Sequence, residues 1–461
     1  MSTPDYPIET ILFASAWASA QFALSCLEPH RGHLRAKSSF VTPDGEIMHW
    51  HDFGDLEGPG WASNAVGGAH LLHRWARYLG DETMQARALL LLDHVLADGF
   101  IDEETGFIWP YYELAQDRFC LNYVHRDDWL CPGSLARVGV QMLEFADDLG
   151  QDARVPNLRQ AAQRLGGWLR GRVSLLPNGW TPRRITLDGQ PFPLTPHCAS
   201  ILQDGQPDPI FDHSADGLFL LQLAVALTAR GLGDHSHEVA TLADAFTAAA
   251  HASATEPGFW GSINHDTYDD HENVAYAVAF RTLRQAADLL NRPAWRDFAY
   301  RLALPGLGRY RMAEDRNGVA TRGLLWMEES WDTAYLWENA EAARAYLEAW
   351  AETGDEAHRD VGLDILRAIA NHHYGDRGFL TEGVDWNNHV SQRHHIGEAL
   401  YAAIRYTEPL LNNLHLLAPT LFYFEQLGYR PPEGLDAAAA IHLVSELGAD
   451  ARSIAAAAPS G

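Results

Sequence analysis

Lysine is almost absent from this chain: Lys37 is the only one among 34 basic residues, so nearly every cation is an arginine. This excludes, almost completely, catalysis through a lysine Schiff base and a phosphate-binding loop that depends on lysine. Basic residues are also few beside 61 acidic ones, and the formal net charge is −27. Such a balance excludes the basic surface that nucleic-acid binding requires, and it opposes docking on an anionic membrane.

Cysteine is scarce as well, with four residues and no CxxC spacing. The cysteines therefore predict neither a disulfide framework nor a zinc site, and they favour a reducing compartment. No apolar run has the length that a membrane span needs. The apolar stretch 11–27 follows Asp5 and Glu9 rather than basic residues, so we expect a packed helix there instead of a secretory leader, and hence a cytoplasmic protein.

A turn glycine followed by a short polar or aromatic stretch recurs along the chain, with gaps of 61, 73, 79, 60 and 60 residues. A loop and then two helices follow each glycine. The first helix is apolar on nearly all faces, as in 215–230 and 273–290, and the second is amphipathic, as in 238–252 and 356–372. The glycines are Gly45, Gly106, Gly179, Gly258, Gly318 and Gly378.

Six pairs of an inner and an outer helix predict an all-α fold, the (α/α)6 barrel or toroid. An array of HEAT or TPR repeats is the competing prediction, but such arrays have shorter, more regular periods and short loops. Here the loops before the inner helices are long and variable, and such loops usually carry function. We expect one catalytic domain over residues 1–450, with an extra helix over 6–27, and a flexible tail over 451–461.

Tryptophan is concentrated in these loops, which would share one rim of the barrel and which hold nine of the 15 tryptophans. Exposed indoles suit sugar rings, whose C–H faces stack on aromatic planes. The alternative is that the indoles wedge the loops onto the barrel. The candidates for sugar binding are Trp50, Trp129, Trp180, Trp260, Trp331 and Trp386.

Acidic residues gather at the same helix starts. Glycoside hydrolysis needs two carboxyl groups across a cleft, one as the acid and the other as a base or nucleophile. Glu272 and Asp332 form the first candidate catalytic pair, with Glu329, Asp216 and Glu338 in reserve. Capping of free helix N–H groups is the alternative role for an aspartate such as Asp332.

Histidine, arginine and asparagine accompany these acids, and helix capping does not explain them. The adjacent Arg183 and Arg184 would clamp a carboxylate or sulfate through paired hydrogen bonds, which favours a substrate that contains uronic acid. The other polar residues expected to bind or polarise the substrate are His51, Arg126, His213, His271, Asn388, His389, Arg393 and His394.

A lyase is the first alternative. Asn388 and His389 resemble part of the Asn-Asn-His signature of toroid alginate and heparin lyases, and Tyr123, Tyr268 and Tyr374 lie near helix ends. An enzyme of that class removes the proton next to a uronate carboxylate with tyrosine or histidine and neutralises the carboxylate with asparagine, histidine or arginine.

Two further functions stay open. A sugar epimerase or isomerase would use two histidines as acid and base, for example His271 and His394. A helical scaffold would bind a protein partner and would need no rim of histidine, tryptophan and aspartate. The loop 265–271 is rich in aspartate and histidine but lacks a metal-ligand spacing, so we expect no metal and no cofactor.

With its six glycines, apolar inner helices and rim of tryptophans and carboxylates, the chain resembles the bacterial (α/α)6-barrel carbohydrate enzymes, among them unsaturated glucuronyl hydrolases and related uronic-acid glycosidases. The glycine-rich motif near the catalytic aspartate of unsaturated glucuronyl hydrolases is absent, so no catalytic residue is carried over. The resemblance implies a sugar bound at the rim and acid/base chemistry by carboxylates. We therefore expect a glycoside hydrolase that acts from the end of a small acidic oligosaccharide; the oligomeric state stays open.

Overall fold

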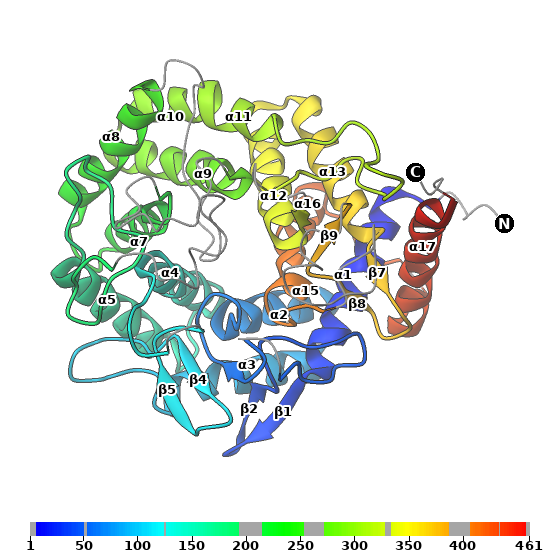
Figure 1. Ribbon diagram of the computed structural model, residues 1–461, viewed down its shortest axis with the longest axis horizontal. Helices are drawn as coiled ribbons and strands as arrows, with labels where there is room; N and C mark the ends of the chain where they lie inside the picture. Colours follow the sequence, from blue (N-terminus) through cyan, green and yellow to red (C-terminus); the bar gives the residue numbers. More distant parts are fainter. Residues whose placement is uncertain are drawn as a thin grey trace. The chain divides into compact units, whose positions relative to one another are not determined.

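The fold is described by a computed structural model that covers residues 6–49, 53–123, 126–192, 214–252, 272–327, 333–386, 406–432 and 434–457 (Figure 1). Two compact units make up the chain, and each is described by itself. Three helices have residues in both units: α2 (Ala65–Leu79), α3 (Glu82–Ala97) and α11 (Leu304–Gly308). Unit 1 comprises Met1–Leu56, Leu71–Leu90 and Gly308–Gly461, and unit 2 comprises Glu57–His70 and Leu91–Leu307.

Unit 2 is a succession of helical hairpins, coloured from teal to green in Figure 1. Helices α4, α7 and α9 pack one against the next, and each also packs against the helix that follows it in the chain. This is the alternation of inner and outer helices that the repeat predicts. The bounds are α4 Pro132–Leu149, α5 Val155–Arg172, α7 Gly217–Ala229, α8 Ser236–Ala252, α9 Asn273–Leu290 and α10 Pro293–Phe298, followed by the π-helical turn Ala299–Ala303.

The inner helices are buried because their sequences are apolar on almost every side. Helix α7 reads GLFLLQLAVALTA, and its leucine side chains are almost entirely buried. Burial of each such leucine stabilises the fold by about 1.5–3 kcal/mol. Helix α4 approaches α7 closely at Gly139, where a Cβ atom would lie 2.9 Å from the Leu223 side chain. The predicted inner helix 273–290 coincides with α9, and the predicted outer helix 238–252 lies within α8.

Unit 1 is built in the same manner from helices far apart in the sequence. Helix α1 packs against α13 and α17, and α12 packs against α13 and α16. The predicted helix over 6–27 is α1, and α17 extends as far as Ala457, so the flexibility expected after Asp450 stays a prediction. The bounds are α1 Ile8–Ser25, α12 Leu336–Thr353, α13 Glu356–Ala370, α15 Asn412–His415, α16 Leu417–Leu427 and α17 Ala437–Ala457. Within the described residues of the chain, no helix combines the length and the apolar character needed to cross a bilayer.

Short strands join the helices. In unit 1, three antiparallel pairs have the registers Leu27↔Ala36, Thr333↔Asp385 and His373↔Leu380, and in unit 2 β4 and β5 pair with Tyr111 opposite Cys120. The strands are β1 Leu27–His30, β2 His33–Ala36, β3 Leu56–Glu57, β4 Tyr111–Glu113, β5 Arg118–Cys120, β6 Thr333–Tyr335, β7 His373–Tyr374, β8 Phe379–Leu380 and β9 Gly383–Asp385.

The recurring glycines have a conformational cause. All those that the structure describes adopt positive φ, between 76° and 83°, where a residue with a Cβ atom is strained. At Gly378 the close approach of another segment adds to this, since a Cβ atom would lie 2.4 Å from the carbonyl oxygen of Ala18. The glycines with these angles are Gly45, Gly106, Gly179, Gly318 and Gly378; Gly258 lies outside the described residues.

Candidate active site

Two helix starts of unit 2 meet at Asp216, the residue that precedes α7. Its Oδ2 atom accepts a hydrogen bond of 2.8 Å from the backbone N–H of Gly133, in the first turn of α4. The N-terminus of a helix favours a negative charge, so this contact stabilises the carboxylate form. A Cβ atom at position 133 would lie 2.3 Å from Cγ of Asp216. Glycine is therefore the residue that lets the acid reach this helix end.

Close contacts also fix the backbone around Asp216, from Ser214 to Gly217. Its N–H donates to Oγ of Ser214 at 3.2 Å, and Ser214 is fully buried. A Cβ atom at Gly217 would lie 2.4 Å from Oγ1 of Thr181, so the loop that carries the two arginines approaches the start of α7 closely. Asp216 itself is 1% exposed. Its Oδ1 atom has no hydrogen-bond partner among the residues that the structure describes, and a ligand could use it.

An isolated antiparallel bridge positions the arginine pair. Leu130 and Ile185 exchange backbone hydrogen bonds of 2.8 Å and 3.0 Å, so residues 129 and 184 each lie next to the bridge in their own segment. The Arg184 guanidinium then lies 4.0 Å from the ring centre of Trp129. Trp129 is fully buried, and Arg184 is 3% exposed. The Arg184 guanidinium therefore stacks on the Trp129 ring in a cation–π interaction, which helps to orient the cation.

The electrostatic surroundings raise the pKa of Asp216 from 3.8 to about 7. Burial is the main cause, because an apolar environment disfavours the charged form, and the nearby Glu272 adds to it. The Gly133 hydrogen bond and the charge of Arg183 act in the opposite direction but are weaker. A carboxyl group with this pKa still holds its proton at pH values where an ordinary aspartate has lost it.

Arg183 and Glu272 complete the cluster. Burial lowers the pKa of Arg183, the charge of Arg184 lowers it further, and Glu272 and Asp216 are among the groups that raise it. Glu272 is fully buried and stands in extended conformation just before α9. The site thus places two acids at the starts of α7 and α9 beside two buried arginines. Such a set can give a proton, accept one and bind an anionic group.

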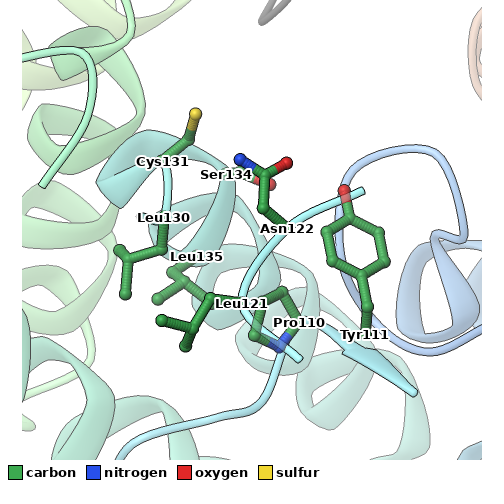
Figure 2. A pocket seen from close by; sticks show the side chains of 8 residues that line it. All are labelled: Pro110, Tyr111, Leu121, Asn122, Leu130, Cys131, Ser134 and Leu135. Atoms are coloured by element: carbon green, nitrogen blue, oxygen red, sulfur yellow. The ribbon is translucent and has the colours of Figure 1, made fainter. Parts of the chain in front are cut away.

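A small pocket opens along the same turn of α4. Its volume is about 10 Å³, room for about one water molecule, and the side chains of Leu121, Leu130 and Leu135 lie on one side. Figure 2 shows the polar ends of Asn122 and Cys131 on the opposite side. The pocket is therefore too small for a sugar and large enough only for a water molecule.

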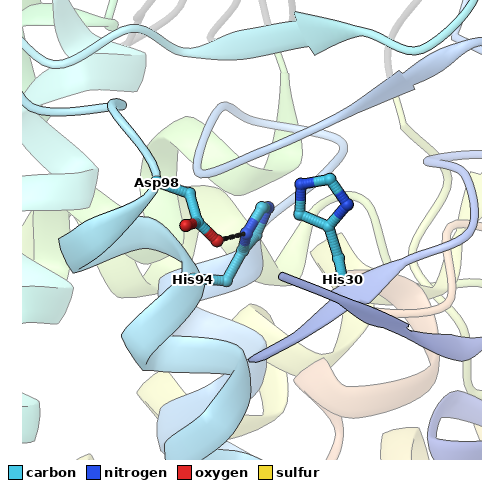
Figure 3. Close-up of side chains that lie close together, drawn as sticks. All are labelled: His30, His94 and Asp98. Atoms are coloured by element: carbon cyan, nitrogen blue, oxygen red, sulfur yellow. Dashed lines mark hydrogen bonds and ion pairs between the residues drawn. The ribbon is translucent and has the colours of Figure 1, made fainter. Parts of the chain in front are cut away.

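Unit 2 also holds a buried histidine between two carboxylates. Nδ1 of His94 lies 2.7 Å from Oδ2 of Asp98 (Figure 3), and Nε2 lies 2.9 Å from Oε1 of Glu57. Burial by itself lowers the pKa of His94, but the hydrogen bonds and charges of Glu57 and Asp98 outweigh burial and raise it. The two carboxylates therefore favour the protonated form of His94, which ties the end of α3 to β3.

Five residues predicted from the sequence come together in this site: Asp216, Glu272, Arg183, Arg184 and Trp129. Gly133, Asn122 and Ser134 were not predicted from the sequence. One signal was present in the run Cys131-Pro132-Gly133, since proline at the first position of a helix marks its start. For Asn122, which lies in a loop, the sequence carries no such signal.

Two other predicted residues of unit 2 have structural partners. Trp180 is 1% exposed, its ring packs on Phe246 at 4.8 Å between ring centres, and Nε1 donates to the Ala245 carbonyl at 3.4 Å. Trp180 therefore anchors its loop on α8, which is the alternative role that the sequence left open for these tryptophans. It offers no open face for a sugar. Arg126 binds the Tyr123 carbonyl, and its Nε lies 3.4 Å from Oε1 of Glu113.

In unit 1, the structure describes two predicted residues. Glu338 is fully buried in the first turn of α12. Trp386 is 6% exposed, and its carbonyl accepts a hydrogen bond of 2.8 Å from Asn317. The remaining predicted residues lie outside the described part of the chain and stay predictions: Trp50, His51, His213, Trp260, His271, Glu329, Trp331, Asp332, Asn388, His389, Arg393 and His394.

Comparison with known proteins rests on structure, because no family model and no curated protein sequence matches the chain. Cellobiose 2-epimerase from Bacillus thermoamylovorans B4167 has a TM-score of 0.61 and 11% identity, over 88% of this chain and 95% of the epimerase. The GH76 α-mannanase from Bacteroides thetaiotaomicron has a TM-score of 0.56 and 7% identity, over 91% and 97%. Unsaturated glucuronyl hydrolase from Bacillus sp. GL1 has a TM-score of 0.51 and 12% identity, over 90% and 96%. Similarity at these identities concerns the fold, and the chain is an all-α (α/α)6 barrel of the kind found in these carbohydrate enzymes.

Proposed function

We propose that this protein is a glycoside hydrolase that cleaves a small oligosaccharide containing uronic acid. The observation that carries the proposal is the convergence of Asp216, Glu272, Arg183 and Arg184 in one buried cluster of unit 2. Structural similarity to a mannanase and to a glucuronyl hydrolase supports a carbohydrate substrate.

In the proposed reaction, Asp216 is the general acid. Its carboxyl group gives a proton to the glycosidic oxygen as the bond from that oxygen to the anomeric carbon breaks. Glu272 is the base: it takes a proton from the water molecule that attacks the anomeric carbon. Asp216 suits the acid role because its pKa of about 7 keeps it largely protonated below neutral pH. Glu329, Asp332 and Glu338 remain further candidates for the catalytic carboxylates.

The two arginines are proposed to bind the uronate carboxylate. A guanidinium group offers paired N–H donors to a carboxylate, and the interaction is stronger where water is excluded. Arg183 and Arg184 are 2% and 3% exposed. A neutral group in place of the carboxylate would forgo these charge-assisted hydrogen bonds, so the arginine pair favours acidic sugars.

A sugar epimerase or isomerase is the second candidate, favoured by the similarity to cellobiose 2-epimerase, whose TM-score of 0.61 exceeds those of the two hydrolases. Such an enzyme would also need an acid and a base in a pocket. The product distinguishes the candidates, since hydrolysis adds one water to the substrate, epimerisation leaves its mass unchanged, and elimination creates an unsaturated uronate.

The test is incubation with a panel of uronate-containing and neutral oligosaccharides, followed by mass spectrometry and by ultraviolet absorbance. We expect products that carry one added water, without new absorbance, and a loss of activity of at least about 100-fold in Asp216→Asn. Asp234→Asn is the matched control, because Asp234 is exposed and hydrogen-bonds only to the start of α8 in the described structure. New absorbance would favour a lyase, and an isomeric product of equal mass would favour the epimerase.

A further inference from the structure

One face of helix α4 carries an arginine among otherwise small or neutral residues. Gly133, Arg137 and Gln141 follow one another at intervals of four residues, so they share this face. At one end of it, Gly133 donates its N–H to Asp216, just before α7. At the other end, Nε2 of Gln141 donates to Oδ1 of Asn64, just before α2, at 2.8 Å. Arg137 therefore lies on the side of α4 that faces the starts of α2 and α7.

The side chain of Arg137 is held near the first turn of α7. Side chains in a helix tilt toward its N-terminus, and Arg137 follows Gly133 by one turn, about 6 Å along the axis. Its guanidinium carbon lies 4.6 Å from the ring centre of Trp61. The Trp61 ring in turn meets the ring of Phe219 edge to face, with 5.6 Å between the ring centres. Phe219 belongs to the first turn of α7 and follows Asp216 by three residues.

The ring of Trp61 orients the Arg137 guanidinium through a cation–π interaction. The pair repeats the arrangement of Arg184 on Trp129, where the corresponding distance is 4.0 Å. Arg137 is 7% exposed and Trp61 is 5% exposed. Because water is largely excluded, an anion that meets this guanidinium forms a strong, charge-assisted hydrogen bond. The second arginine–tryptophan pair is therefore preorganised for an anionic group.

The two arginine sites serve different parts of a ligand. The charges that act on Asp216 are those of Arg183 and Glu272. Arg137 stands one helix turn further along α4, so a group that it binds belongs to the sugar next to the one that Asp216 protonates. Among these residues and Arg184 there are three cations and two acids, and Asp216 is largely protonated below neutral pH. Positive charges then exceed negative ones by at least two, which favours a ligand with two acidic groups.

We propose that Arg137, oriented by Trp61, is a second anion-binding residue of the active site, and that it binds a carboxylate or sulfate on the sugar next to the one bound by Arg183 and Arg184. The preferred substrate then carries two acidic groups on neighbouring sugars. The assignment rests on the proposed function, in which Asp216 is the acid, and it adds the charge pattern of the substrate.

Two variants separate the charge of Arg137 from its packing. Arg137→Met removes the charge but keeps a long, unbranched side chain over the Trp61 ring. Arg137→Lys keeps the charge but lacks the planar pair of N–H donors. Arg292→Met is the matched control, because Arg292 also lies over a tryptophan, with 5.8 Å to the ring centre of Trp295, and is exposed just before α10. Circular dichroism and urea unfolding show that each variant is folded.

The measurement is calorimetric titration with three saccharides. D-glucuronate carries one acidic group, digalacturonate carries two carboxylates, and a disaccharide of glucuronate and 6-sulfated glucosamine carries a carboxylate and a sulfate. We expect the wild type to bind one of the two disaccharides more tightly than D-glucuronate, which identifies the second acidic group. In Arg137→Met the Kd of that disaccharide should rise roughly 10- to 100-fold, the value of one hydrogen bond between charged groups, while the Kd of D-glucuronate stays the same. Arg137→Lys should be intermediate, and Arg292→Met should match the wild type.

The outcomes separate this subsite from the proposed reaction. If an acidic oligosaccharide is hydrolysed but Arg137→Met binds both disaccharides as the wild type does, the second subsite is wrong and the hydrolase stands. Equal weakening for D-glucuronate and the disaccharides would place Arg137 in the first subsite and would also overturn the assignment. If a disaccharide loses affinity selectively in Arg137→Met but is not hydrolysed, and no oligosaccharide of the panel is, the subsite stands and the reaction class is wrong. If none of the three saccharides binds and no oligosaccharide reacts, both proposals are wrong.

Discussion

Replacing Asp216 by asparagine removes a titrating group whose pKa lies at 3.8 in a model peptide and at about 7 in the folded protein. The folded protein binds this proton more tightly than the unfolded chain, so the group's contribution to stability is fully present below about pH 4 and is lost as the pH rises to about 7. Between about pH 5 and pH 8 the loss is about two pKa units, or about 3 kcal/mol. Asparagine cannot ionise, yet its side-chain oxygen can still accept from Gly133.

The assay is urea unfolding followed by circular dichroism at several pH values from about 5 to about 8. We expect the free energy of unfolding of Asp216→Asn, relative to wild type, to rise by about 3 kcal/mol over this range and to level off above about pH 7. Asp234→Asn is the control: contacts with Ser236 lower the pKa of Asp234, so this exposed group is ionised in both states over the whole range. A difference between Asp216→Asn and wild type that stays constant with pH would show that Asp216 ionises normally, and its role as the acid would be refuted.

Three further predictions concern single side chains. Gly133→Ala places a Cβ atom 2.3 Å from Cγ of Asp216 and displaces the acid, so we expect kcat to fall about 100-fold while circular dichroism shows the helices retained; unchanged kcat would contradict the geometry. His94→Leu leaves Glu57, 1% exposed, without its cation, and we expect the free energy of unfolding at neutral pH to fall by roughly 3–5 kcal/mol in urea titrations; a loss below about 1 kcal/mol would mean that the pair is not buried. Burial lowers the pKa of His373 from 6.5 to about 4, so its contribution to stability is present above about pH 6.5 and is lost as the pH falls to about 4. His373→Gln should remove about 2 kcal/mol of this acid sensitivity, measured by unfolding at about pH 7 and pH 4.5, and equal pH profiles for the variant and the wild type would disprove it.

The helices were predictable because their cause is local. The all-apolar inner helix 273–290 and the amphipathic outer helix 356–372 follow from the spacing of apolar residues, and the second ends two residues earlier, at Ala370. Glycines such as Gly150 and Gly354 stop helices because they adopt positive φ, which depends on the residue itself. The chain divides into two compact units, and the single catalytic domain expected over residues 1–450 stays a prediction.

The candidate site was predictable only in part. Asp216 and Glu272 stood out as acids at helix starts, but sequence spacing does not distinguish an acid that caps its own helix from one that binds the start of another. The same limit applies to tryptophan: Trp129 carries Arg184 on its ring, whereas Trp180 packs on the outer helix, although both lie in similar loops.

The sequence by itself determined the all-α class, the helix pairs and the acidic, tryptophan-rich loops, because periodicity, glycine and composition act over a few neighbouring residues. Tertiary structure alone decided that Asp216 accepts from Gly133, 83 residues away along the chain, and that burial keeps its proton on near neutral pH. It alone also brought Asn122, whose Oδ1 accepts from the backbone N–H of Tyr123, beside the same helix turn. A pKa and a pocket depend on how segments distant in the sequence exclude water together, and no local pattern contains that information.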